Sequence, residues 1–198
     1  MTTIYERFGP SLQHSDLANP LAPCYVGLEC EIEGILDHGA ANNLGFNITN
    51  DGSLRNNGYE YITNAIPIPS AVEKFTNLHA KLKTKKGEKF SQRTSIHVHV
   101  NCVAYEENVV RNIIMLYALF EEAFFLLVDA ERRDNIHCVP LTETYLPSLY
   151  RENIPRLVER WHKYTALNIK PLSQYGTVEF RHMQGHDDPI ILTEWLGS

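Results

Sequence analysis

The 198-residue sequence has few cysteines, and they lack the spacing that would give them a role. Cys24, Cys30, Cys102 and Cys138 form no CxxC pair, so a structural zinc site of the usual kind is not expected. The sequence also has no GxxxxGK[ST] segment and no GxSxG segment, which excludes a P-loop and the nucleophile of an α/β-hydrolase. Any catalytic groups therefore have to come from another arrangement of residues.

Positive charge and long apolar runs are also scarce. Eighteen Lys and Arg against 24 Asp and Glu give a net charge of -6, which argues against nucleic-acid binding through bulk electrostatics. The longest apolar run, residues 113–128, contains Glu121 and Glu122 and is not expected to span a membrane. Residues 1–23 lack the basic start and apolar centre of a signal peptide. We therefore expect a cytoplasmic protein with no nucleic-acid or membrane partner.

Patterns typical of strands and helices follow one another irregularly after a leader at residues 1–23, which is expected to be irregular. Alternating apolar and polar residues predict strands over residues 24–34, 46–49, 59–64, 94–102 and 175–183. Apolar residues at helical spacing predict helices over residues 70–82, 106–132, 148–163 and 189–196. The first of these helices is expected to begin with a capping box of Ser70 and Glu73. The order predicts an α+β fold with a mainly antiparallel sheet and helices packed on one face.

Three glutamates lie on one side of the strand predicted over residues 24–34. Glu29, Glu31 and Glu33 alternate with apolar residues, and no Lys or Arg in the segment relieves their repulsion. A solvated outer face is one interpretation of this pattern. The other is a site for a hard divalent cation, because carboxylate oxygens are the ligands that Mg²⁺ and Mn²⁺ prefer.

Two further strands carry ionisable residues on one face. His97 and His99 share the polar side of the strand over residues 94–102, although surface or core histidines explain most such pairs. On the last strand Glu179 and Arg181 share a face, either as a structural ion pair or as a metal ligand beside an anion-binding arginine. Because the polar faces of such strands converge on one open surface, together they favour metal-assisted phosphoryl chemistry.

In combination these segments resemble the amidoligase enzymes of the glutamine synthetase and glutamate–cysteine ligase superfamily, the carboxylate–amine ligases. The matching segments are GLECE at residues 27–31, DGSL at 51–54 with GYE at 58–60, IHVHVN at 96–101 and TVEFR at 177–181. Their order is that of the family. The resemblance implies a glutamine synthetase-like catalytic fold, in which the sheet forms an open funnel, and a single catalytic domain over residues 24–198.

The resemblance also implies roles for individual residues. The implied metal ligands are Glu29, Glu31, Glu60, His97 and Glu179. His99 and Arg181 are implied to contact the transferred phosphate of ATP, and Asp51 to be an extra ligand or to orient the amine. The implied reaction uses ATP with Mg²⁺ or Mn²⁺ to convert a carboxylate to an acyl phosphate, which an amine then attacks to form an amide. The substrates are expected to be small-molecule or peptide carboxylates and amines.

Two alternatives remain open at this point. A phosphotransferase (kinase) on the same fold would transfer phosphate without making an amide, and an inactive module would bind a nucleotide or a partner protein. The chain also stops soon after the last predicted strand, where such proteins usually continue with more helices. Truncation at the C-terminus and a naturally short version are both consistent with this.

Overall fold

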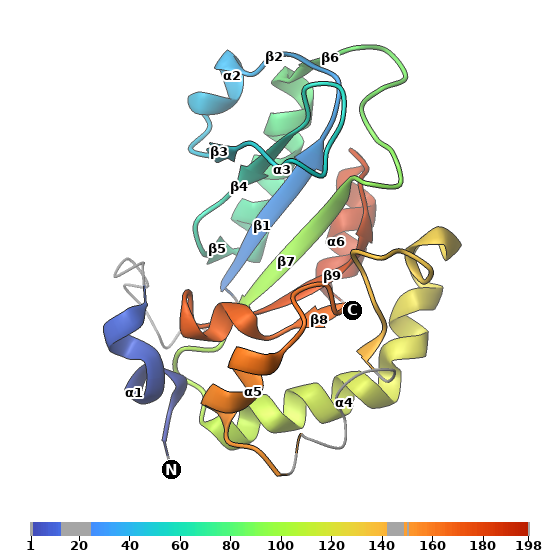
Figure 1. Cartoon of the computed structure of the whole chain (residues 1–198). Coiled ribbons are helices and arrows are strands. Elements are labelled where there is room, and N and C mark those ends of the chain that lie inside the picture. The colour runs from blue at the N-terminus through green and yellow to red at the C-terminus, as the bar shows by residue number, and fades with distance from the viewer. Residues whose placement is uncertain (1, 13–24, 142–148, 150, 198) are drawn as a thin grey trace. The chain divides into compact units, whose positions relative to one another are not determined.

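The computed structural model describes residues 2–12, 25–141, 149 and 151–197 (Figure 1). The chain divides into two compact units. Unit 1 is Met1–Cys24 with His99–His182, and unit 2 is Tyr25–Val98 with Met183–Ser198. Strands β7 (Ser95–Asn101) and β9 (Thr177–Gln184) each contribute residues to both units.

Unit 2 contains most of the strands. Besides its part of β7 they are β1 (Tyr25–Ile32), β2 (Ile35–Asp37), β3 (Asn47–Thr49), β4 (Tyr59–Ile62), β5 (Ile66–Pro67) and β6 (Lys83–Thr84). The strand order is β3-β4-β1-β7, and β5 also pairs with β1, while β2 and β6 form a separate pair. The pairs β1/β4, β1/β5, β3/β4 and β2/β6 are all antiparallel. The helices are α2 (Gly39–Asn42), α3 (Ile68–Lys81) and α6 (Pro189–Gly197).

The alternation in β1 produces the core of unit 2. Val26, Leu28, Cys30 and Ile32 are buried, as the sequence pattern predicts. Helix α3 packs against β1 and against α6, and it buries Ala71, Phe75 and Leu78 on one face. One face of β1 is thus covered by α3. The opposite face, which carries the glutamates, is not covered by this helix.

The start of α3 differs from the prediction. The helix begins at Ile68 with Pro67 as its N-cap residue, and no side chain caps it. Ser70 therefore lies inside the first turn, where its backbone is already helical, and the predicted Ser70–Glu73 capping box is wrong. Pro69 explains the earlier start, because proline in the first helical turn needs no hydrogen-bond partner for its nitrogen.

Unit 1 is mainly helical. Its elements, besides its parts of β7 and β9, are α1 (Ile4–Phe8), η1 (Gly9–Ser11), α4 (Glu107–Leu126), η2 (Ala130–Arg132), α5 (Ile154–Arg160), β8 (Leu167–Asn168) and η5 (Lys170–Ser173). The strand order is β7-β9-β8, and β8 and β9 are antiparallel. Its core contains Ile114 and Tyr117 of α4 with Val178 of β9, and Phe180 packs against it.

The leader is more ordered than its composition predicts. Thr3 and Glu6 form a capping box at the start of α1, and the helix buries Ile4 and Phe8, which join the core of unit 1. Residues 13–23 of the leader lie outside the described residues. The helix predicted over residues 148–163 is shorter, at Ile154–Arg160, and of its earlier part residues 148 and 150 lie outside the described residues.

The fold is mixed α+β with a mainly antiparallel open sheet and helices, as the sequence predicts. The finer prediction, a glutamine synthetase-like funnel, stays a prediction. Within the described part of the chain, no helix combines the length and the apolar character needed to cross a membrane.

Candidate metal centre

Strands β1 and β4 bring three glutamates to one side of the sheet in unit 2. In their antiparallel register Glu31 stands opposite Glu60, and Glu29 stands opposite Ile62. Residues opposite each other across two strands point to the same face, as do residues two apart on one strand. Glu29, Glu31 and Glu60 therefore share a face. The burial of the apolar face of β1 against α3 holds them there in spite of their like charges.

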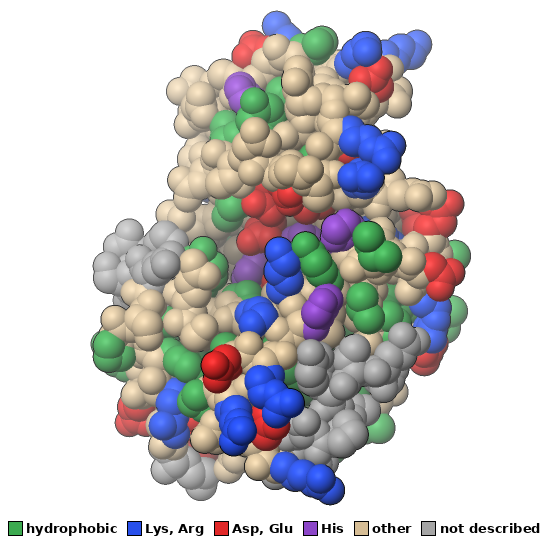
Figure 2. All heavy atoms as spheres, viewed as in Figure 1, with side chains coloured by type: hydrophobic (Ala, Val, Ile, Leu, Met, Phe, Trp, Pro, Cys, Tyr) green, Lys and Arg blue, Asp and Glu red, His purple; other side chains and the backbone are tan. Residues whose placement is uncertain are grey.

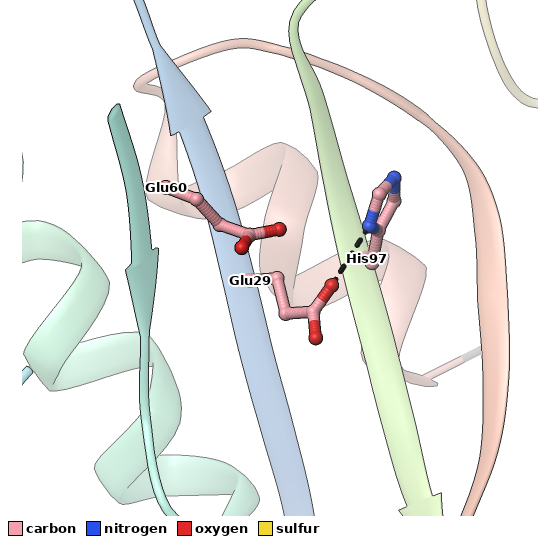
Figure 3. Close-up of side chains that lie close together, drawn as sticks. All are labelled: Glu29, Glu60 and His97. Atoms are coloured by element: carbon pink, nitrogen blue, oxygen red, sulfur yellow. Dashed lines mark hydrogen bonds and ion pairs between the residues drawn. The ribbon is translucent and has the colours of Figure 1, made fainter. Parts of the chain in front are cut away.

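The first group of ligand atoms comes from Glu29, Glu60 and His97 (Figure 3). One ligand atom from each lies within 4.8 Å of the others, and Nδ1 of His97 is 3.0 Å from Oε2 of Glu29. Figure 3 shows the three side chains coming from β1, β4 and β7, with both carboxylates turned toward the imidazole side. Carboxylate oxygens with one imidazole are a donor set for Mg²⁺ or Mn²⁺, and also for Zn²⁺.

A second group shares Glu60 with the first. Ligand atoms of Glu31, Asp51 and Glu60 also lie within 4.8 Å of one another. Asp51 reaches this position from the turn before β4, where its Oδ1 accepts a hydrogen bond of 2.7 Å from the backbone of Ser53. One glutamate common to two acidic groups is an arrangement that can hold two neighbouring cations.

The surroundings of Glu60 disfavour its negative charge. Burial first, and then the negative charge of Glu29, raise the pKa of Glu60 to about 7. The hydroxyl of Thr49, which donates to Glu60 over 2.9 Å, acts in the opposite direction. The same causes, burial and the neighbouring glutamates, raise the pKa of the Cys30 thiol far above its usual value, so Cys30 is not a nucleophile. A bound divalent cation would offset this repulsion.

Ser95 is a residue of the site that sequence reasoning missed. Its hydroxyl donates to Oε2 of Glu31 over 2.5 Å and lies 2.8 Å from Nε2 of His97. The signal was available, because Ser95 precedes His97 by two residues and so shares its face of β7. The contacts resemble a Ser–His–Glu triad, but Ser95 is only 3% exposed and its hydroxyl donates its hydrogen bond to Glu31. The serine therefore orients the imidazole and the carboxylate instead of acting as a nucleophile.

The interpretation of Glu29, Glu31 and Glu33 as a solvent-exposed face is wrong for the last two. Glu31 is 5% exposed and Glu33 is 2% exposed. Glu33 is used in the structure of a loop, since its Oε1 accepts a hydrogen bond of 2.8 Å from the backbone of Arg55. In the same loop a side chain at Gly58 would lie 2.4 Å from Cβ of Leu54, so glycine is required shortly before Glu60.

Solvent can still reach the group. Glu29 and Glu60 are both partly exposed. Figure 2 shows acidic side chains gathered on the face turned to the viewer. An ion held by these two partly exposed carboxylates can therefore exchange with solvent.

The other predicted site residues belong to unit 1. His99 is buried, and its Nδ1 lies 2.9 Å from the hydroxyl of Thr177. Glu179 is buried as well; it accepts a hydrogen bond of 2.6 Å from the side chain of Asn168 and forms an ion pair with Arg181. The structure therefore brings Glu179 and Arg181 together, and in unit 2 it brings together Glu29, Glu31, Asp51, Glu60 and His97. The functional roles assigned to these residues stay predictions.

Arg132 supports the strand that carries Arg181, and sequence reasoning missed it. It is 3% exposed, and its guanidinium donates to the carbonyl oxygens of His182 over 2.9 Å and of Arg181 over 2.7 Å. Arg181 also donates from Nε to the carbonyl oxygen of His137 over 3.3 Å. Nothing in the sequence near Arg132 marks it, because its partners are backbone atoms about 50 residues away.

A comparison with known families identifies one that this chain matches. The family model described as "Putative amidoligase enzyme" matches residues 25–195, which is most of the chain. The chain belongs to this amidoligase family. A search of the curated proteins found no match. The resemblance to an amidoligase is therefore confirmed, whereas membership of the glutamine synthetase and glutamate–cysteine ligase superfamily stays a prediction.

The matched region of the amidoligase contains both acidic groups described above. Their donors are mostly carboxylate oxygens, which are the ligands that hard divalent cations prefer. Within unit 2, Glu29 contacts His97, Glu31 accepts a hydrogen bond from Ser95, and Glu60 accepts one from Thr49.

Proposed function

We propose that this amidoligase is an ATP- and Mg²⁺-dependent carboxylate–amine ligase that forms an amide bond through an acyl phosphate. The observation that carries the proposal is the position of Glu60, which belongs to two groups of ligand atoms at once. The family assignment supports a ligase. The acidic groups supply ligands for the metal ions that neutralise the phosphates of a nucleoside triphosphate.

The proposed reaction has two steps. A carboxylate oxygen of the first substrate takes the γ-phosphoryl group of ATP, which yields an acyl phosphate and ADP. The amine nitrogen of the second substrate then attacks the acyl carbon, inorganic phosphate leaves, and the nitrogen loses a proton. Mg²⁺, when bound, neutralises charge on the phosphate oxygens, and Mn²⁺ has the same ligand preferences.

The residues of the chain have separate proposed tasks. Glu29, Glu31, Glu60 and His97 hold the cation, with Ser95 orienting the last of them, and Asp51 is a further ligand or orients the amine. Glu179 is proposed as another ligand. Arg181 and His99 are proposed to bind the transferred phosphate, because a guanidinium offers several donors in a fixed plane and stays charged. These donors stabilise the charge that develops on the phosphoryl group.

The first experiment measures thermal unfolding with ATP, ADP, AMP and GTP, each with and without Mg²⁺. A ligand at about 100 times its Kd stabilises the folded state by about 2.7 kcal/mol, which raises Tm by several degrees. We expect a shift with ATP that requires Mg²⁺. Glu29→Gln should remove it, whereas Glu73→Gln, a change at an exposed glutamate of α3, should keep it. The absence of a shift with every nucleotide would contradict the proposal.

The second experiment identifies the product. Carboxylates and amines are screened in pairs for phosphate release from ATP, and the product is analysed by mass spectrometry. A ligase needs both substrates and yields their mass sum less one water. A kinase would yield a stable phosphorylated product from one substrate, and an inactive module would bind MgATP without release. Glu179→Gln, which changes a carboxylate to an amide of nearly the same shape, should abolish turnover and leave the fold intact.

A further inference from the structure

The helix α4 is the longest in the described part of the chain (Figure 1), and it buries only one side in unit 1. Val110, Ile114, Tyr117, Glu121 and Phe125 are buried, at the spacing of three and four residues that marks one helical face. The sequence alone treats the entire helix as apolar enough to be central. The structure shows that a second apolar face remains on the outside.

The outer face of α4, together with the C-cap residue Leu127, carries six large apolar side chains. They are Val109 (39% exposed), Leu116 (56%), Leu119 (74%), Phe120 (59%), Leu126 (85%) and Leu127 (58%). The charged residues of the helix are used elsewhere: Arg111 donates to the carbonyl oxygen of Glu152 over 2.6 Å, and Glu122 pairs with Arg133. A helix with apolar residues on both sides is typically covered on both sides.

The spacing of the exposed residues points to the shape of what covers them. Residues of the exposed face recur at alternating intervals of three and four, which is the a/d spacing by which one helix packs along another. We name this set of residues the α4 seam; it consists of Val109, Asn112, Leu116, Leu119, Ala123 and Leu126. Phe120 and Leu127 flank it. The partner of the seam is therefore expected to be a helix of similar length.

The amount of apolar surface is close to what a dimer needs. A large apolar side chain has on the order of 100–200 Å² of surface, so the six exposed side chains present about 500 Å². This is near the upper limit for a patch on a monomer, and because only about 60% of an interface is apolar, it corresponds to the roughly 800 Å² per partner of a stable interface.

We propose that the α4 seam packs against the α4 seam of a second copy of this chain. The seam has no charged residue, so neither a basic nor an acidic partner matches it. An apolar stripe along one helix can pack against its own copy across a two-fold axis, and its single polar residue, Asn112, can fix the register of the two helices. The proposal does not depend on the ligase function, and either can fail alone.

Analytical ultracentrifugation of the wild-type chain tests this at protein concentrations up to about 100 µM, above the micromolar Kd of the weakest interfaces of standard size. We expect a species of twice 22.7 kDa and a Tm that rises with protein concentration. Leu119→Glu and Leu126→Glu should each give a monomer, because both place a charge in the seam. Circular dichroism in the near-ultraviolet shows whether these variants are folded.

The matched control is Leu36→Glu, which adds the same charge at an apolar residue of β2 that is 68% exposed. It should remain a dimer. A wild-type monomer at every concentration would overturn the proposal, which would leave the seam to another partner. A dimer that persists in both folded seam variants, or one that Leu36→Glu also dissociates, would overturn it as well.

Discussion

Nδ1 of His97 lies 3.0 Å from Oε2 of Glu29, although 68 residues separate the two in the sequence. Since Nε2 of the same ring lies 2.8 Å from the hydroxyl of Ser95, the two ring nitrogens have different surroundings. Nδ1 is the nitrogen turned toward the carboxylates. We therefore expect His97 to bind a cation through Nδ1, while Ser95 maintains the orientation of the ring.

Replacing Glu60 by glutamine tests the shared position of this residue in the two acidic groups. Glu60→Gln should abolish the Mg²⁺-dependent rise in Tm, because both groups lose a charged ligand. Without Mg²⁺ the variant should be more stable than the wild type by about 1 kcal/mol at pH 8, since it removes the repulsion with Glu29 that raises the pKa of Glu60. Denaturant unfolding with and without Mg²⁺ measures both effects, and a variant that retains the Mg²⁺ response would contradict the site.

Ser95→Ala tests whether the serine orients His97. The change removes the hydrogen-bond partner of Nε2 and of Glu31, so we expect Mg²⁺ to bind 10- to 100-fold more weakly, a range typical of residues that orient metal ligands. Stability should fall by about 1–3 kcal/mol, because two buried polar groups lose a partner. Calorimetric titration with Mg²⁺ gives the affinity. Ser91→Ala, at an exposed serine of the preceding loop, is the control and should bind Mg²⁺ as the wild type does.

Arg181→Lys tests the proposed phosphate contact. A lysine keeps the charge but has no planar set of donors, so it cannot maintain the ion pair with Glu179 and also donate to the carbonyl oxygen of His137. We expect a loss of about 10²- to 10³-fold in kcat with little change in Tm. Arg156→Lys, at an exposed position of α5, should leave kcat unchanged. Equal rates in the two variants would show that Arg181 has no part in catalysis.

Acid should destabilise the fold through His182. Burial first, and then the nearby charge of Arg132, lower the pKa of His182 from 6.5 to about 3. Between these two pH values the unfolded chain binds a proton that the folded chain does not. The stability is therefore present above pH 6.5 and is lost as the pH falls, by up to about 1.4 kcal/mol per pH unit from this group.

Urea unfolding between pH 7 and pH 4 checks the expectation for His182. His182→Gln should be less stable at pH 7, because it disturbs the contact of 2.6 Å between Nε2 and the hydroxyl of Tyr117, but its stability should depend less on pH. His162→Gln, at an exposed histidine, should keep the pH dependence of the wild type. An unchanged slope in His182→Gln would assign the acid sensitivity to other groups.

Much of the sheet could be predicted from local pattern. The alternation in residues 24–34 and 94–102 predicts β1 and β7 to within two residues at each end, because a strand with one covered face needs an apolar residue at every second position. The first turn of α3 was predicted less well. Pro69 and Ser70 offer two competing starts, and only packing of the helix against β1 selects the earlier one.

The candidate site shows the same division between local and distant information. Glu29, Glu31 and His97 could be proposed from the polar faces of their strands, whereas Glu60 could be proposed only from the segment GYE that resembles the family. Arg132 could not, since it acts on backbone atoms far along the chain.

The sequence by itself determined which residue types stand on each face of each strand, and so which chemical groups the protein has. It also determined the family to which the chain belongs. The periodicity of two in a strand is a local property, so no tertiary contact is needed to read it. Only the tertiary structure decided that Glu31 stands opposite Glu60, that Ser95 completes the contacts of His97, and that half of α4 stays exposed. Register and burial depend on which distant segments pack together, and that is a property of the whole chain.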